Sequence, residues 1–450
     1  MKNPSKKIIV VGTGFKGMMA ALNLVKRGFK VTMIDGSKNF GGVLNSPKWE
    51  DMYIDLGCHL FFNQEDELTR DILEVLSGEY KTVPNNYGSY FRQQLTEDIA
   101  IPNFELLDSQ EKDGIYYDML HPKEIFPEVT SLQQFYVNRF GKKATKWINH
   151  FIEKAYRIRS EKLDLMANFL LPYNRIRVFS VKEALKLKEE QYFDDKIAIP
   201  RKSNLKERTE NINKKAFNFF EYYPLNNGLH FFCERLKEIL IEKGVEIQLG
   251  NSIESIESKD EFIVKIKNEK VKAPYLYWAA PQYLLPKIFK LDIDLQSFLH
   301  PVPLILYYFT VDKETINDFT YIQNYDLEDF CFRVSIQSNY ADNNIPKDVA
   351  LICCEVPSKV DSNVWYNSER FTDQIWEEVV KMGICKSPTY QKSNILKTPS
   401  AFTLPLKGYL DGFNKVKERL PLKNILGIRN WDYAKNDILK DIHNEINDIL

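Results

Sequence analysis

The hydrophobic pattern near the N-terminus predicts a strand, a helix and a second strand in immediate succession. A β-branched run over residues 7–11 is typical of a buried strand. Apolar residues at helical spacing over 15–27 predict a helix, which Gly28 ends as a left-handed cap. Residues 30–34 repeat the strand pattern and end at Asp35. These residues therefore predict one β-α-β unit.

Comparable elements recur in the middle and at the end of the chain. The pattern predicts a helix over 229–243 and a strand over 275–281 that a proline stops. A last strand over 424–428 precedes a last helix over 437–450. We expect these pieces to form one discontinuous Rossmann-like domain of the α/β class, interleaved with an α+β domain. The expected segments of the first domain are 1–84, 216–289 and 416–450, and those of the second are 85–215 and 290–415.

Other stretches bear on exposure and on compartment. The highly charged residues 185–215 have few apolar anchors and predict an exposed connection or a mobile lid. The longest apolar tract, over 302–310, suits a buried strand, and no run of about 18 apolar residues occurs. A signal peptide would need more residues than precede the glycine motif at residue 12. We therefore expect a cytoplasmic protein without an integral membrane segment.

Charge and cysteine content exclude several classes of function. Lys plus Arg total 61 against 62 Asp plus Glu, a formal net charge of −1. A nucleic-acid binder or a polybasic membrane binder would draw on an excess of positive charge that is absent here. The six cysteines form no CxxC pair, and none has zinc-site spacing to a histidine, so we expect no metal site. Cys353 and Cys354 lie in an apolar run and are expected to be buried thiols.

A GxGxxG motif occupies residues 12–17, between the first predicted strand and helix. In this context Gly12 allows a tight turn, Gly14 lets the backbone approach a pyrophosphate, and Gly17 lets the helix pack closely on the strand. The helix N-terminus offers free N–H groups to the phosphates. Asp35, at the end of the second strand, can accept hydrogen bonds from a ribose. The sequence therefore predicts a dinucleotide cofactor.

A glycine pair after Asp35 distinguishes between NAD and FAD as the dinucleotide. Gly41 and Gly42 follow shortly after Asp35. They allow another loop to approach the pyrophosphate closely, and NAD-dependent dehydrogenases usually lack such a pair. The pair therefore favours FAD. Asp55, Gly57 and His59 come next.

This combination resembles the flavin amine oxidase and protoporphyrinogen-oxidase-like superfamily, which includes phytoene desaturases and UDP-galactopyranose mutases. The match rests on the Gly-Gly pair and on an Asp-x-Gly-x-His segment at 55–59. The continuation of this segment is most similar to the branch associated with polysaccharide and nucleotide-sugar pathways, and also to the mutases. The residues that carry this second likeness are His59, Phe61, Glu65, Asp66 and Glu67.

The resemblance extends to three later segments. Residues 223–228 resemble the family's YP-x-GG element, although Asn227 replaces its first glycine. Residues 244–256 resemble its pair of strands, in which Ile253 would contact adenine through its backbone. Residues 277–281 and 424–430 resemble the strands that return to the flavin domain. The helix after the last strand would aim its positive end at the flavin pyrimidine.

The resemblance implies FAD as the cofactor, an FAD-binding role for the discontinuous domain and a substrate-binding role for the interleaved one. The implied cofactor-binding residues are Gly12, Gly14, Phe15, Gly17, Asp35, Gly36, Gly41, Gly42, Ile253, Ala280, Arg429 and Asn430.

Three residues are candidates for the chemistry itself. The resemblance places His59 near the isoalloxazine ring; the alternative is a histidine hydrogen-bonded at a strand end. Arg175 and Arg333 fall in the expected substrate domain, where arginine forks suit phosphates and carboxylates. Solvated or structural arginines are the alternative for both.

Three hypotheses about function follow. The first is an FAD-dependent oxidoreductase that takes a hydride from a small-molecule substrate, with a nucleotide sugar or polysaccharide precursor as the suggested class. The second is a redox-neutral isomerase of the UDP-galactopyranose mutase type that uses reduced FAD. The third is a flavin-fold binding protein without catalysis. The third is motivated by two departures from the family, Val43 after the Gly-Gly pair and Trp431 at a common glycine position.

Overall fold

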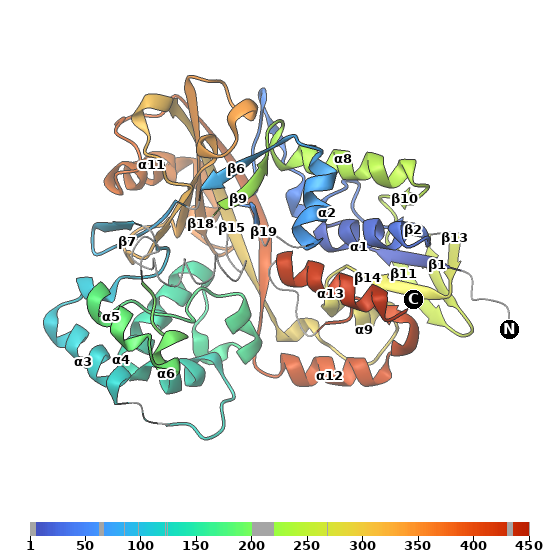
Figure 1. Cartoon of the computed structure of the whole chain (residues 1–450), viewed down its shortest axis with the longest axis horizontal. Coiled ribbons are helices and arrows are strands. Elements are labelled where there is room, and N and C mark those ends of the chain that lie inside the picture. The colour runs from blue at the N-terminus through green and yellow to red at the C-terminus, as the bar shows by residue number, and fades with distance from the viewer. Residues whose placement is uncertain are drawn as a thin grey trace. The chain divides into compact units, whose positions relative to one another are not determined.

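The computed structural model describes residues 6–62, 67–84, 86–97, 99–121, 123, 125–199, 220–267, 269–429 and 435–449. The chain divides into two compact units, each discontinuous in sequence (Figure 1). Unit 1 comprises Met1–Lys81, Tyr222–Phe298 and Gly408–Leu450. Unit 2 comprises Thr82–Glu221 and Leu299–Lys407. Strands β6 (Tyr80–Pro84) and β9 (Phe220–Pro224) run across two of the boundaries.

A five-stranded parallel sheet forms the centre of unit 1, with the strand order β10-β2-β1-β14-β20. β1 is buried at four of its five positions, as expected of a parallel strand that is covered on both faces. Because a β-α-β crossover makes strands parallel, β1 and β2 pair in register from Lys7 with Lys30 to Val11 with Ile34. The strands are β1 (Lys7–Val11), β2 (Lys30–Ile34), β10 (Glu246–Gln248), β14 (Tyr275–Trp278) and β20 (Ile425–Leu426).

Helices and two small sheets complete unit 1. The helices are α1 (Phe15–Lys26), α2 (Glu67–Leu76), α8 (Gly228–Glu242), α9 (Leu285–Ile288), α12 (Tyr409–Arg419) and α13 (Lys435–Asn447). The remaining strands are β3 (Lys48–Trp49), β4 (Met52–Tyr53), β5 (Phe61–Phe62), β11 (Ile253–Ser258), β12 (Phe262–Ile266) and β13 (Glu269–Ala273). Asp71 of α2 holds three of the helices together. Its carboxylate accepts hydrogen bonds from Asn23 and Lys26 of α1 and contacts His443 of α13.

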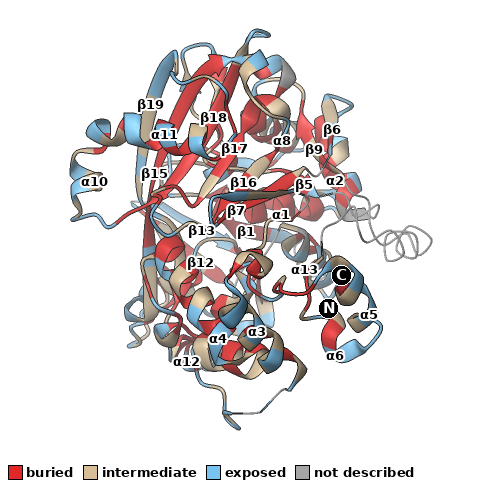
Figure 2. Cartoon of the chain, turned by 90° about the vertical axis from the view of Figure 1, so that its left-hand side faces the viewer, coloured by how far each residue is buried: buried red, intermediate tan, exposed pale blue. Residues whose placement is uncertain are grey.

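Unit 2 is built on a seven-stranded mixed sheet with the order β19-β15-β18-β17-β16-β7-β8. All its pairs are antiparallel except β16 with β7. Figure 2 shows that buried residues dominate β15, β17 and β18, which explains why the longest apolar tract of the chain lies there. The strands are β7 (Tyr87–Phe91), β8 (Gln94–Glu97), β15 (Leu299–Asp312), β16 (Tyr321–Asn324), β17 (Arg333–Ile336), β18 (Val349–Pro357) and β19 (Lys392–Pro405).

Helix α4 is the longest element among the helices that the structure describes in unit 2. It runs from Leu132 to Tyr156 and is kinked at Gly141, whose φ of 82° is not helical. Ser131 caps its start by accepting a hydrogen bond from the Gln134 N–H. The other helices are α3 (Ser109–Leu120), α5 (Val181–Leu187), α6 (Gln191–Asp194), α10 (Asn363–Tyr366) and α11 (Thr372–Lys381).

The expectation of an exposed connection over residues 185–215 holds only in part for the residues that the structure describes, because many of residues 185–196 are exposed but the stretch is partly helical and anchored. The charged sequence contains α6, and Phe193 and Ile197 are buried. These two apolar residues anchor the stretch, because one buried large side chain per turn outweighs the solvation of the flanking charges. Residues 200–215 lie outside the described residues. No helix in the described part of the chain is long and apolar enough to cross a membrane.

Candidate functional site

The carboxyl edge of the parallel sheet gathers the predicted cofactor residues of unit 1. In a parallel sheet all strands end at the same edge, and ligands of this fold bind where neighbouring strands lead to loops in opposite directions. The loops after β1, β2, β14 and β20 begin at Gly12, Asp35, Ala279 and Gly427. Residues that are hundreds of positions apart therefore share one edge.

The glycine motif has the close packing that its spacing predicts. A Cβ on Gly17 would lie 2.0 Å from the Gly12 oxygen, so no larger residue fits where α1 meets β1. Gly14 differs, because a Cβ there would meet no atom within 4 Å. Gly14 is the N-cap of α1 and leaves the helix N-terminus accessible. This open space is what a phosphate group needs to approach the helix N-terminus.

Asp35 connects the first two loops. Its Oδ2 accepts hydrogen bonds from the backbone N–H and the hydroxyl of Thr13, both at 2.7 Å. Its Oδ1 accepts one from the Ser37 N–H at 2.8 Å. A carboxylate has about four lone-pair sites, so these contacts orient the side chain and leave capacity for a ribose hydroxyl.

The glycine pair forms a second loop against the first. The Gly41 N–H donates to the Thr13 oxygen at 3.0 Å. Gly41 has a φ of 102°, and a Cβ there would lie 2.5 Å from the Cys233 sulfur of α8. A Cβ on Gly42 would lie 3.2 Å from the Gly14 Cα. Any ligand at Gly14 therefore has the Gly41-Gly42 loop beside it.

Two further predicted residues lie at the same edge. The Asn251 N–H donates to the Asp35 oxygen at 2.9 Å, which places the start of β11, with Ile253, next to the predicted ribose acid. A Cβ on Gly36 would lie 3.3 Å from the Ser252 hydroxyl. A Cβ on Gly12 would lie 3.1 Å from the Ala280 nitrogen. The structure thus brings the loops that carry Gly36, Ile253 and Ala280 to the glycine motif.

Asp55 is the centre of a buried polar network. Its carboxyl accepts hydrogen bonds from the Ser46 hydroxyl and the Tyr223 hydroxyl, each at 2.6 Å, and from the backbone N–H of Leu229 in α8. Burial raises the pKa of Asp55 from 3.8 to about 6, against the opposing effect of these donors. Asn227 precedes α8 in a left-handed conformation, with a φ of 54°. Asn tolerates this conformation better than most residues, so it can replace the family's glycine.

We predict that Asp55 makes the stability of the protein pH-dependent. Because its folded-state pKa is raised, the protonated form stabilises the fold below about pH 4, and that contribution is lost as the pH rises through 6. Relative to Asp55→Asn, the wild-type free energy of unfolding should fall by about 3 kcal/mol between pH 3 and 8. Urea unfolding at a series of pH values measures this difference. The exposed neighbour Asp51 supplies the control, Asp51→Asn, and an equal effect of both substitutions would contradict the prediction.

A buried charge cluster lies at the end of β20. Lys16, within the glycine motif, is 6% exposed and donates from Nζ to the Gly427 oxygen at 2.8 Å. The Gly427 N–H donates to Glu445 Oε2 at 3.1 Å. Burial raises the pKa of Glu445, opposed in part by Lys16. Arg429 forms an ion pair with Asp441 of α13. The turn that carries Arg429 is therefore bonded to both α1 and α13.

The three candidates for chemistry occupy different surroundings. His59 is half-buried in the loop between β4 and β5 of unit 1. Arg175 is exposed in unit 2 and donates to the Asp195 oxygen at 3.3 Å. Arg333 of β17 makes a two-pronged ion pair with buried Glu355, at 2.6 and 2.9 Å. Arg175 and Arg333 therefore donate to different acceptors in these contacts.

The structure places the other predicted residues as follows. Phe15 is buried and packs near Phe61 and Phe232, with ring centroids 6.2 and 6.5 Å apart. Val43 is 49% exposed, beside the Gly41-Gly42 loop. Asn430 and Trp431 lie outside the described residues, as do Glu65 and Asp66.

Sequence reasoning missed Lys16 and the Asp55 network. The signal for Lys16 was a long charged side chain in the motif that packs a helix against a strand, where a small residue is expected. Nothing in the sequence pairs Asp55 with Tyr223, since 168 positions separate them. All six cysteines are free, and no metal-binding group of His, Cys, Asp or Glu occurs in the part of the chain that the structure describes.

Comparisons with known proteins identify the fold. Residues 10–76 match the model of the NAD(P)-binding Rossmann-like domain. The 4,4'-diaponeurosporene oxygenase of Staphylococcus aureus (strain MRSA252) is 21% identical over 299 residues, 60% of this chain and 55% of the oxygenase. The chain therefore spans about half the length of that relative.

Two solved structures match almost the whole chain. Reduced UDP-galactopyranose mutase superimposes with a TM-score of 0.75 at 14% identity, covering 99% of this chain and 96% of the mutase. Wild-type putrescine oxidase bound to putrescine gives a TM-score of 0.64 at 14% identity, with 98% of each chain covered. These likenesses show the fold, a Rossmann-like dinucleotide-binding domain within a two-domain chain. The predictions of the superfamily, the fold class and FAD as the cofactor agree with these comparisons.

Proposed function

We propose that this protein belongs to the flavin amine oxidase-like superfamily and is an FAD-dependent oxidoreductase that acts on a small molecule. When bound, FAD would supply the acceptor for a hydride from a substrate carbon. The observation that carries the proposal is the space at Gly14, which lies between the N-terminus of α1 and the Gly41-Gly42 loop. Two glycine loops that approach one point suit a pyrophosphate that is contacted from both sides.

The residues at this edge fit the parts of FAD. The first N–H groups of α1 point toward the space at Gly14 and would donate to the pyrophosphate. Asp35 is held by Thr13 and Ser37, so it would receive the ribose without reorganising. The segment at Asn251 and Ile253, bonded to the Asp35 turn, would contact the adenine. The turn at Gly427, bonded to Lys16 and Glu445, would hold Arg429 toward the flavin end.

An absorbance spectrum of the purified protein, with the cofactor identified by mass, tests the cofactor. We expect the spectrum of bound oxidised flavin and the mass of FAD. Anaerobic addition of candidate substrates then tests the reaction, and we expect bleaching with a redox-active substrate. A flavin spectrum that no candidate substrate changes would contradict the oxidoreductase. A protein that neither contains nor takes up FAD would favour the binding-protein hypothesis.

A second candidate function is a redox-neutral isomerase of the mutase type. The supporting observation is the match to reduced UDP-galactopyranose mutase over 99% of this chain. A nucleotide sugar is then the proposed substrate class, and the anionic diphosphate would suit Arg175 or Arg333. Turnover of a UDP-sugar only after reduction with dithionite is the expected result. Equal turnover with oxidised flavin would exclude this candidate.

A further inference from the structure

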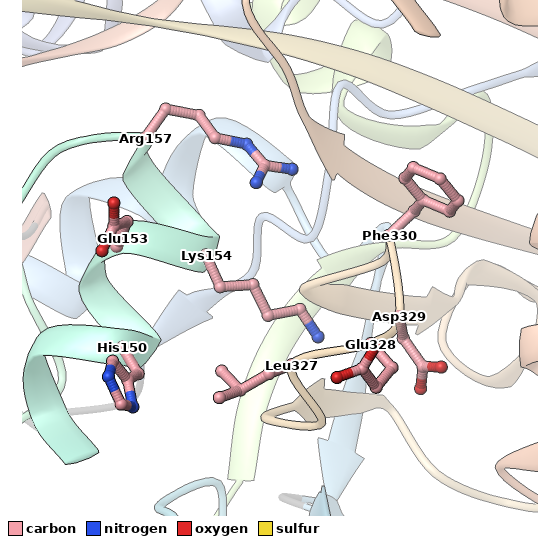
Figure 3. A pocket seen from close by; sticks show the side chains of 8 residues that line it. All are labelled: His150, Glu153, Lys154, Arg157, Leu327, Glu328, Asp329 and Phe330. Carbon is pink, nitrogen blue, oxygen red and sulfur yellow. The ribbon is translucent and has the colours of Figure 1, made fainter.

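A buried lysine and a half-buried arginine lie at the C-terminal end of α4 in unit 2. Lys154 belongs to the last turn of the helix, and Arg157 is its C-cap residue, in a left-handed conformation with a φ of 57°. Lys154 is 7% exposed, and Arg157 is half-buried at the end of the helix. Figure 3 shows both side chains reaching from the helix into one pocket, which the loop with Leu327 and Phe330 faces.

Backbone carbonyls satisfy only part of these side chains. Lys154 Nζ donates to the Asn324 oxygen at 3.2 Å and to the Asp326 oxygen. Arg157 donates from Nε and Nη2 to the Pro357 oxygen, at 3.1 and 2.6 Å. An ammonium has three donors and a guanidinium five, so each cation keeps donors that these carbonyls do not use.

Neither cation has a carboxylate counter-ion within ion-pair distance among the described residues. The pocket is lined by three acids, but Asp329 is bonded to Lys381 at 2.8 Å and to the Asn324 amide at 3.0 Å. Glu153 and Glu328 are exposed, so water screens their charges. Asp329, Glu378 and Asp326 attract Lys154, and Glu153 attracts Arg157, but among the described residues none of these carboxylates forms an ion pair with either cation.

This arrangement is energetically unusual. Burying a charge is strongly unfavourable unless a counter-charge or several hydrogen bonds replace its hydration. Desolvation lowers the pKa of Lys154 to about 8 and also lowers the pKa of Arg157, which indicates that the surrounding acids offset only part of the cost of burial. An external anion would supply the charge that the chain itself does not.

We infer that this pocket binds a small organic anion through a phosphate or carboxylate group held between Lys154 and Arg157. Its volume of about 340 Å³ admits a ligand larger than the anion alone. The apolar side chains of Leu327 and Phe330 would contact the rest of the ligand. All the lining residues belong to unit 2, so the inference is independent of the proposed flavin site.

Isothermal titration calorimetry on the full chain, at constant ionic strength and pH 7, tests the site with two probes, inorganic phosphate and acetate. We expect at least one probe to bind with a dissociation constant of about 1 mM or tighter. Arg157→Gln and Lys154→Met should each weaken that binding at least about tenfold. Lys186→Gln, which removes one charge from exposed α5 of the same unit, should leave it unchanged within about twofold.

Four results would overturn the inference. They are no binding of either probe to the wild type, undiminished binding in Arg157→Gln, undiminished binding in Lys154→Met, and an equal loss in Lys186→Gln. Undiminished binding in both pocket variants would assign the anion to another site, such as the glycine loops. Circular dichroism must show a wild-type fold for each variant, and Arg157→Gln remains informative if Lys154→Met does not fold.

Discussion

Gly14→Ala is expected to weaken FAD binding by about 100-fold or more without changing the stability of the apo-protein. Gly14 has φ and ψ of −70° and −179°, which alanine adopts without strain. The added methyl group would meet no protein atom within 4 Å. It would instead occupy the space through which a pyrophosphate approaches the backbone. Fluorescence titration of the apo-protein with FAD, beside thermal unfolding, measures both quantities.

Gly17→Ala is the matched contrast to this substitution. It adds the same methyl group three residues later, where that group would lie 2.0 Å from the Gly12 oxygen. We expect this variant to lose stability by several kcal/mol, about the effect of other overpacked positions. If Gly14→Ala bound FAD like the wild type, the open space would have another purpose, and the proposed cofactor geometry would be wrong.

Lys16→Met is expected to lower the free energy of unfolding by about 3 kcal/mol. The substitution removes the positive charge that most favours the ionised form of buried Glu445, and leaving a buried charge without compensation typically destabilises by that amount. It also removes a donor from the buried Gly427 oxygen. Burial already raises the pKa of Glu445, so its carboxyl can take up a proton at low pH. The loss of unfolding free energy in Lys16→Met should therefore be smaller at low pH.

The double variant Lys16→Met/Glu445→Gln separates charge from packing. We expect it to recover much of the lost stability, because neither buried charge then remains unpaired. Lys30→Met, at the exposed start of β2, is the control and should change stability by less than about 0.5 kcal/mol. Urea unfolding of the wild type, Lys16→Met, Glu445→Gln and the double variant gives the coupling energy. A double variant no more stable than Lys16→Met would show that the two side chains do not interact.

The part of the proposed cofactor site that could be predicted from the sequence is the part formed by the backbone of one local motif. Gly12, Gly14 and Gly17 are required by a strand that turns directly into a helix, and this requirement is local in sequence. Asp35 was predictable for the same reason, since it ends the next strand of the same β-α-β unit. Asn227 shows a limit of motif reading, because its left-handed conformation preserves the turn although the glycine is lost.

The exposed connection expected over 185–215 shows how composition can mislead. Charged residues dominate the stretch, but a few buried apolar side chains such as Phe193 are enough to order a short helix. Burial of one large side chain contributes about 2 kcal/mol, whereas solvated charges add little in either direction.

The sequence alone determined the class of fold and the dinucleotide motif, and it predicted the superfamily. These depend on hydrophobic periodicity and on glycines at fixed spacing, which act over a few residues. Only the tertiary structure decided that Lys16 bonds the turn at Gly427, that Asp55 is buried against Tyr223, and that Lys154 and Arg157 line one pocket without an ion pair to any described carboxylate. Burial and charge compensation depend on contacts between residues that are far apart in the sequence, and no local sequence pattern predicts such contacts.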